Sequence, residues 1–227
     1  MKNDKKINPG DVVALGDIHG MWEMYEQFLQ DVEGTGAVVV ILGDMIDRGG
    51  GDLEVLSATL DRLQDPEAFG LGAFYALRGN HEEMFLNAGS GDNSAWAIWV
   101  QNGGNWEDYT DMLKGHAEWI KQLPHYMTIG DTLFVHAGIS PGKDPAWLIQ
   151  ERKADYLLWI RQPFLAYGPE FQDWNPNLKL VVHGHTPCDE PTVENDRINI
   201  DTGACFKDGY LTAYNVTQGN FLHYHAK

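Results

Sequence analysis

Short apolar runs, rich in β-branched residues, recur along the chain and predict buried strands. Each of the five clearest runs is followed closely by a polar residue that can bind a metal or carry a proton. These runs occupy residues 12–15, 38–42, 73–77, 132–135 and 178–182. Because open α/β folds place their sites at the carboxyl ends of strands, we expect the polar residues after these runs to meet at one sheet edge.

Helical spacing of apolar positions appears between these runs. Residues 21–32 and 52–63 place large apolar side chains three or four positions apart, and Asp52 stands at the expected N-cap of the second segment. The pattern returns to strands near the carboxyl end, at residues 197–201, 210–216 and 221–224. Strands that alternate with helices in this way predict an α/β fold.

The middle of the chain is rich in aromatic residues and glycines. Residues 105–122 are expected to form a helix that breaks near Gly115. Residues 87–94 and 163–177 are expected to be loops, of the kind that shape access to a site. Three tryptophans have the spacing of helical core residues, so we expect them to pack in the interior: Trp96, Trp99 and Trp106.

Composition narrows the classes of protein that the chain can belong to. Its 227 residues, 43% of them apolar, suit one domain spanning 1–227 with a substantial core. The formal net charge of -17 repels a phosphate backbone, so no nucleic-acid partner is expected. The longest apolar run, residues 37–42, is too short for a membrane span, and the polar start leads into no signal-peptide core. Two cysteines are too few for a disulfide framework, so we expect a cytoplasmic protein without a membrane partner.

The polar residues after the strands have the chemistry of metal ligands. Asp17 and His19 are two positions apart, so at a strand end they point to the same side. Together with Asp44 they are expected to hold one divalent metal ion. The second ion would share Asp44 and take three more ligands: Asn80, His136 and His185. Oxygen and imidazole ligands without a thiolate suit manganese, iron or zinc.

A histidine beside these ligands can move a proton. His81 follows Asn80 directly, and adjacent residues on an extended segment point apart, so His81 is free to act as a general acid. Such a histidine needs a carboxylate that fixes its tautomer, and Asp47 is the expected partner. His183 lies two residues before His185, and the sequence leaves its role open between the site and the core.

Arginine usage indicates a phosphate site. Arg48 and Arg78 lie inside the metal motifs, and Arg161 follows an apolar, aromatic run. A guanidinium makes strong bidentate contacts with phosphate oxygens, so we expect these three side chains to hold a substrate phosphate. Two metal ions side by side can activate a water molecule and clamp the same phosphate, which points to phosphoester hydrolysis.

Five short motifs, in order, carry a resemblance to a known family. They lie at residues 16–20, 43–49, 78–82, 136–138 and 184–186, and each follows a predicted strand. The set resembles the phosphoprotein phosphatase family of calcineurin-like metallophosphoesterases, in its small bacterial and phage subgroup. The resemblance implies an α/β metallophosphoesterase fold of four layers, a central β-sandwich flanked by helices. It also implies the ligand set and the roles given above, and two ions that are manganese in bacterial members.

Three functions compete on this evidence. The first is a serine/threonine protein phosphatase, a monomer whose partner is a phosphoprotein or phosphopeptide. The second is a diadenosine tetraphosphate hydrolase or broad small-molecule phosphatase of the same superfamily; residues 47–49 and 184–186 favour the protein phosphatase over the dinucleotide branch. The third is a partner-binding scaffold without catalysis, which the complete site disfavours. The motif residues are suited to bind a phosphate group but not the molecule to which it is attached, so phosphotyrosine and small monoesters stay open as substrates.

Overall fold

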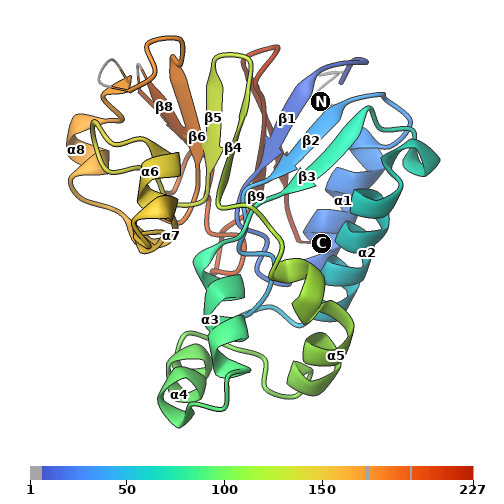
Figure 1. The fold of residues 1–227 in the computed structure, drawn as a ribbon. Helices are drawn as coiled ribbons and strands as arrows, with labels where there is room; N and C mark the ends of the chain where they lie inside the picture. The colour runs from blue at the N-terminus through green and yellow to red at the C-terminus, as the bar shows by residue number, and fades with distance from the viewer. Residues whose placement is uncertain (1–6, 172–173, 195, 227) are drawn as a thin grey trace.

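Two five-stranded sheets form the centre of the computed structural model, which describes residues 7–171, 174–194 and 196–226 (Figure 1). The first sheet has the order β10-β9-β1-β2-β3, with β1 Val12–Leu15, β2 Val38–Ile41, β3 Ala73–Ala76, β9 Leu211–Asn215 and β10 Asn220–Tyr224. The second has the order β4-β5-β6-β8-β7, with β4 Tyr126–Ile129, β5 Thr132–Val135, β6 Leu180–His183, β7 Thr192–Val193 and β8 Arg197–Asn199.

Each sheet has a parallel centre, and the two centres end at the same place. β1, β2 and β3 pair in parallel in the first sheet, and β5, β6 and β8 do so in the second. The segments after β1 and β6 meet, because the backbone N–H of His185 donates to the Asp17 carboxylate at 3.2 Å. The carboxyl ends of both parallel sets therefore converge between the sheets. The motif residues meet as predicted, but at the ends of two sheets rather than at one sheet edge.

Helices cover the outer face of each sheet. α1 Trp22–Val32 and α2 Asp52–Gln64 lie against the first sheet, whereas α6 Pro145–Gln150, α7 Asp155–Trp159 and α8 Phe164–Tyr167 lie beside the second (Figure 1). The order of layers is helices, sheet, sheet, helices, which confirms the predicted fold class. α3 Asn80–Ala88, α4 Asn93–Gln101 and α5 Tyr109–Ile120 lie below the sheets in Figure 1, and the short helix η1 Pro66–Phe69 lies between α2 and the start of β3.

Apolar side chains from both inner faces fill the space between the sheets. Val40 and Leu42 come from the first sheet and pack near Phe134 and Val182 of the second. A larger cluster joins the first sheet to its helices, and a third lies under α6, α7 and α8. Burial of apolar surface stabilises by about 25 cal/mol per Å², so the two sheets are fixed to each other and hold the strand ends in place.

The structure differs from the sequence prediction at several elements. α5 runs through Gly115 without a break, and α8 lies within the expected loop 163–177, of which residues 172–173 lie outside the described part. β4 and β7 escaped prediction because their residues are largely half-buried or exposed and lack an apolar run. Trp99 is buried as expected, but Trp106 is 62% exposed, which contradicts its assignment to the core.

Within the described residues, no helix combines the length and hydropathy needed to cross a membrane. Both cysteines, Cys188 and Cys205, are free thiols, as the low cysteine count predicts. They are half-buried.

Candidate dinuclear metal site

The side chains after the strand ends form one buried group, which we call the metal-type cluster. Asp17 and His19 follow β1, Asp44 follows β2, His136 follows β5 and His185 follows β6, while Asn80 is the first residue of α3; all six are buried. Asn80 Oδ1 lies 2.8 Å from His136 Nε2 and 2.8 Å from His185 Nδ1. Asp44 Oδ2 lies 3.4 Å from His136 Nε2 and 3.7 Å from His19 Nε2. The structure thus brings together all six residues that the sequence assigns to metal binding.

Two overlapping groups in this cluster could each hold a metal ion. One is His19, Asp44 and His81, and the other is Asp44, His136 and His185, with the ligand atoms of each group within 4.8 Å of one another. Asp44 belongs to both, which is the position that a bridging carboxylate requires. His81 stands in the first group where the sequence placed Asp17, whose carboxylate accepts the backbone N–H of His185 at 3.2 Å.

The charges of the cluster favour divalent cations. Burial, with nearby carboxylates, raises the pKa of Asp17 and Asp44 well above the usual range. Burial also lowers the pKa of His19 and His136, which keeps the imidazoles neutral, the form that binds metal. Nε2 of His185 is buried and has no partner among the described residues. Crowded carboxylates, neutral imidazoles and an unpartnered nitrogen fit two metal ions.

His81 and Asp47 form a close pair beside this cluster. His81 Nδ1 lies 2.6 Å from Asp47 Oδ2, and both residues are buried. Burial raises the pKa of Asp47 to about 7 and lowers that of His81 to about 3, so the pair avoids separated charges. A proton held on Asp47 and donated to Nδ1 fixes the tautomer with a proton on Nε2. That nitrogen has no partner among the described residues, so it is available to donate.

Trp99 completes this pair, although the sequence predicts only a core role for it. The indole Nε1–H donates to both oxygens of Asp47 at 3.0 Å. The ring is also buried against Phe85 and Tyr109, so it serves the core and the site together. Its helical spacing revealed the packing, but the direction of the indole N–H depends on the tertiary fold.

The loops that carry the site are held in a conformation that most residues avoid. Five residues of the predicted site have a positive φ: His19, Asp44, Asp47, Arg48 and His185. Each such residue costs on the order of 1–3 kcal/mol unless its surroundings fix it. Hydrogen bonds from neighbouring elements supply that fixation: the Glu82 carboxylate accepts the N–H groups of Asp44 and Met45 at 2.8 and 2.7 Å.

Three carboxylates in or beside the site were not assigned to it from the sequence. Glu82 supports the Asp44 loop, and its place three residues after Gly79 is capping-box spacing that could have revealed it. Asp52 accepts the backbone N–H of Asp47 at 3.0 Å; the sequence placed it at the N-cap, whereas Gly51 occupies that position. Asp201 follows β8 and is buried near Asp17, and burial raises its pKa to about 6.

Two of the three predicted phosphate-binding arginines lie at the site. Arg48 is exposed and its Nη1 lies 2.7 Å from His19 Nε2, while Arg161 is exposed and donates to the carbonyl of His185 at 3.4 Å. Arg78 instead pairs with Glu83 at 3.0 Å and donates to the carbonyl of Lys121. Among the described residues, no hydrogen bond or ion pair joins Arg78 to the metal-type cluster.

His183, whose role the sequence left open, lies in the core. Its ring packs edge-on against Phe164 at 5.1 Å, and its Nδ1 lies 3.2 Å from the carbonyl of Gly184. Burial lowers its pKa to about 4, so the imidazole stays neutral. These contacts account for the burial of His183 by packing, and neither of them is with a predicted metal ligand.

The fold and the site together define a metallophosphoesterase. Residues that can hold two metal ions lie at the strand ends of a helix-flanked β-sandwich, with a histidine–aspartate pair and two arginines beside them. Residues 10–210 match the family described as calcineurin-like phosphoesterase, and the chain belongs to that family. It is therefore a metal-dependent phosphoester hydrolase by family and by site.

Relatives within the family have more than one named activity. The asymmetrical bis(5'-nucleosyl)-tetraphosphatase PrpE of Oceanobacillus iheyensis is 27% identical over 92% of this chain and 89% of that protein. Serine/threonine-protein phosphatase 1 of Salmonella typhimurium is 32% identical over 88% of this chain and 89% of that protein. A protein serine/threonine phosphatase structure from Saccharomyces cerevisiae aligns with a TM-score of 0.63 and 17% identity over 99% of this chain and 82% of that one, which shows a shared fold.

Replacing Trp99 with phenylalanine is expected to slow hydrolysis without loss of metal. Phenylalanine keeps an aromatic ring against Phe85 but removes the N–H that Asp47 accepts. A hydrogen bond between neutral groups contributes about 0.5–1.5 kcal/mol, so kcat for an alkyl phosphate monoester should fall about two- to tenfold. Steady-state kinetics and elemental analysis measure both quantities.

The matched control is Trp96→Phe, because Trp96 packs on Trp99 and Tyr109 in the same aromatic cluster. In a His81→Asn background the Trp99 substitution should have no further effect, since it acts through the Asp47–His81 pair. Equal losses in both backgrounds would show that Trp99 acts only by packing.

Proposed function

We propose that this chain hydrolyses dinucleoside tetraphosphates, cleaving the phosphate chain asymmetrically. The observation that carries this proposal is the likeness to asymmetrical bis(5'-nucleosyl)-tetraphosphatases, which recur among the relatives and align over most of the chain. The sequence motifs favour a protein phosphatase, but the residues in them are expected metal ligands, a proton donor with its partner, and arginines. Such residues respond to a phosphate group and carry little information about what is attached to it.

In this proposal the ligands divide as the sequence predicts. Asp17, His19 and Asp44 would hold one ion, and Asp44, Asn80, His136 and His185 would hold the other. The second set contains the group Asp44, His136 and His185, whose ligand atoms lie within 4.8 Å of one another. When bound, the two ions would supply a water of lowered pKa and positive charge for the phosphoryl oxygens. The chain is expected to take manganese, with iron or zinc as further candidates for a site of oxygen and imidazole ligands.

The protein's own residues would position the substrate and handle the proton. Arg48 and Arg161 are exposed beside the cluster, where they can hold the oxygens of the phosphate chain. Water adds to one phosphorus and the bridging P–O bond breaks. The departing oxygen takes the proton on His81 Nε2 while the proton held on Asp47 passes to Nδ1, and the proton that the attacking water loses restores the pair. Asp47 keeps His81 in the required tautomer through the 2.6 Å hydrogen bond. Unequal cleavage of four phosphates yields a nucleoside monophosphate and a nucleoside triphosphate.

A phosphoprotein phosphatase is the second candidate. The observation that favours it is the 32% identity to serine/threonine-protein phosphatase 1, which is higher than the identity to PrpE of Oceanobacillus iheyensis. The same cluster, arginines and His81 would serve a phosphoserine or phosphothreonine monoester. Under this second candidate the enzyme would be a monomer that acts on a phosphoprotein or phosphopeptide.

An activity panel on manganese-loaded protein decides between the two. It should compare diadenosine tetraphosphate, phosphoserine and phosphotyrosine peptides, nitrophenyl phosphate and a phosphodiester. We expect the highest kcat/KM for the tetraphosphate, with AMP and ATP formed in equal amounts on ion-exchange chromatography. A higher kcat/KM for a phosphopeptide, or ADP as the product, would contradict the proposal. Asp44→Asn protein prepared in parallel excludes a contaminating hydrolase.

A further inference from the structure

The loop between β8 and β9 places an exposed aromatic ring at the edge of the metal-type cluster. Phe206 is 52% exposed. It borders a hollow of about 450 Å³ that is lined in part by Pro187, Cys188, Thr202, Phe206, Lys207 and Asp208. Pro187 is two residues after His185, and Thr202 follows the buried Asp201, so two segments of the lining continue directly from residues of the site. Its volume falls in the range of small-ligand pockets, about 300–1,000 Å³.

Backbone hydrogen bonds hold the loop that carries the ring. The N–H of Phe206 donates to the carbonyl of Gly203 at 2.8 Å, and the N–H of Gly209 donates to the carbonyl of Phe206 at 3.1 Å. Gly203 has a φ of 67°, and a Cβ there would lie 2.9 Å from Phe206 Cδ2, so the turn depends on glycine. A ring that is already positioned loses little freedom when a ligand packs on it.

Phe206 also lies next to the expected phosphate-binding arginine. Arg48 Cζ lies 5.8 Å from the centre of the Phe206 ring, within the range of a cation–π contact. The same Arg48 reaches His19 Nε2 at 2.7 Å, so one guanidinium links the ring to the metal-type cluster. A ligand that stacks on Phe206 can therefore extend its phosphates toward Arg48 without leaving the site.

The charge of the hollow selects the kind of group that can fill it. Asp189 and Asp208 line it together with a single cation, Lys207. This balance disfavours phosphate inside the hollow itself, but carboxylates accept hydrogen bonds from the amino groups of a neutral heterocycle. Phe206 borders a second hollow of about 450 Å³ as well, so it forms a ridge between two concave surfaces.

We propose that Phe206 stacks against a nucleobase of the substrate, with the base in this hollow and the phosphate chain directed toward Arg48. This inference rests on the proposed function and names the group that distinguishes a dinucleotide from other phosphate esters. Every base has a π face, so stacking gives affinity for nucleotides without strong selection among bases. Phe206 is a specificity-determining residue in this proposal, and the metals and His81 are untouched by it.

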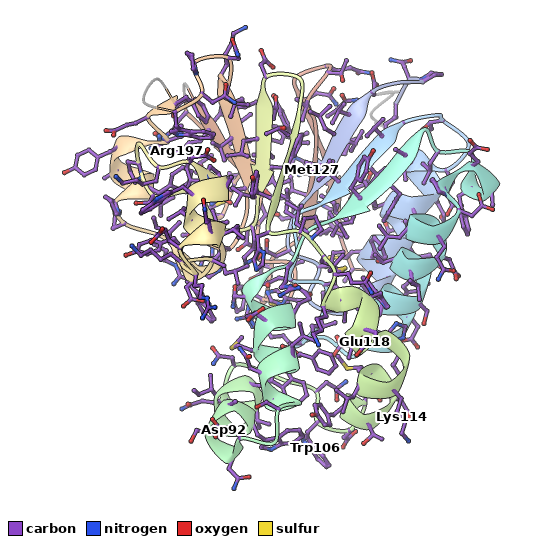
Figure 2. The ribbon with its side chains drawn as sticks, in the orientation of Figure 1. Asp92, Trp106, Lys114, Glu118, Met127 and Arg197 are labelled. Atoms are coloured by element: carbon purple, nitrogen blue, oxygen red, sulfur yellow. The ribbon has the colours of Figure 1, made fainter. Side chains whose placement is uncertain are left out.

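The test compares a substrate that has bases with one that lacks them. Phe206→Ala should raise KM for diadenosine tetraphosphate about 5- to 100-fold, the range expected for loss of one base–aromatic stack. Its kinetics on glycerol phosphate should stay at the wild-type values, and Phe206→Trp should restore the low KM. Trp106→Ala is the control, because Trp106 is 62% exposed and lies far from the sheets, between α4 and α5 (Figure 2).

Three outcomes overturn the stacking proposal. One is an unchanged KM for the dinucleotide in Phe206→Ala. Another is an equal loss on both substrates, which would mean that the ring only positions Arg48. The third applies if the wild-type protein leaves the dinucleotide intact, which would refute the proposed function. Calorimetry with ATP then tests stacking alone: weaker ATP binding by Phe206→Ala than by wild type supports stacking, and equal binding overturns it.

Discussion

Asp44→Asn is expected to remove most of the activity and to lower the metal content at both positions. The Asp44 carboxylate belongs to both candidate metal groups, with Oδ2 at 3.4 Å from His136 Nε2 and 3.7 Å from His19 Nε2. Asparagine has the same shape and can still accept the N–H of His81, which Asp44 Oδ1 accepts at 2.9 Å. The substitution therefore removes a shared negative charge and changes little else.

The size of the effect follows from the number of ions that Asp44 serves. Loss of an outer-shell partner already costs about 10–100-fold in metal affinity or activity, so loss of a shared ligand should exceed about 100-fold in kcat. Elemental analysis of dialysed protein should give less manganese than wild type. Asp61→Asn is the charge-matched control, because Asp61 is exposed on α2. A normal content of two ions in Asp44→Asn would show that the carboxylate is not shared.

The metal-type cluster could be predicted from the sequence because its signals are local. Asp17, Asp44 and His136 directly follow apolar runs or are separated from them by one or two residues, and a strand fixes where its last residue points. The parallel pairing of β1 with β2 and of β5 with β6 then brings these ends together. The α/β fold class follows from the same alternation of strands and amphipathic helices, whereas the four-layer arrangement is implied by the resemblance to the family.

The features that escaped prediction depend on contacts between distant segments. Arg78 belongs to a metal motif, but its side chain pairs with Glu83 one turn into α3, and nothing in the motif distinguishes these two directions. Trp99 has the spacing of a core residue, and only the packing of α4 against α3 reveals that its indole reaches Asp47. Phe206 lies in a loop without periodicity, so its position beside Arg48 has no sequence signal.

The identity of the substrate escaped prediction for a related reason. The motif residues have the chemistry of metal and phosphate ligands, and a phosphate group is common to monoesters and to dinucleotides. Loops can change without altering the elements that hold a catalytic cluster, and in our proposal the loop between β8 and β9 binds the rest of the substrate. The choice between monoesters and dinucleotides therefore has to be tested at residues such as Phe206 and by direct comparison of the two kinds of substrate.

His81→Asn is expected to slow hydrolysis of an alkyl phosphate monoester by about 10²- to 10⁴-fold, the usual contribution of a general acid. His81 Nδ1 is held by Asp47 at 2.6 Å, and its Nε2 has no partner among the described residues, so this nitrogen can protonate a departing oxygen. Asparagine supplies no comparable proton. An activated nitrophenyl ester, whose leaving group needs less protonation, should lose less than the alkyl ester.

The difference between the two leaving groups separates proton donation from metal binding. His81 also belongs to one of the two candidate metal groups, with His19 and Asp44. If His81 acts as the acid, the His81→Asn protein should retain both ions by elemental analysis and should show a steeper dependence of rate on leaving-group pKa. If His81 instead holds a metal, one ion should be lost and both esters should slow equally. His225→Asn, at an exposed histidine, is the control and should behave as wild type.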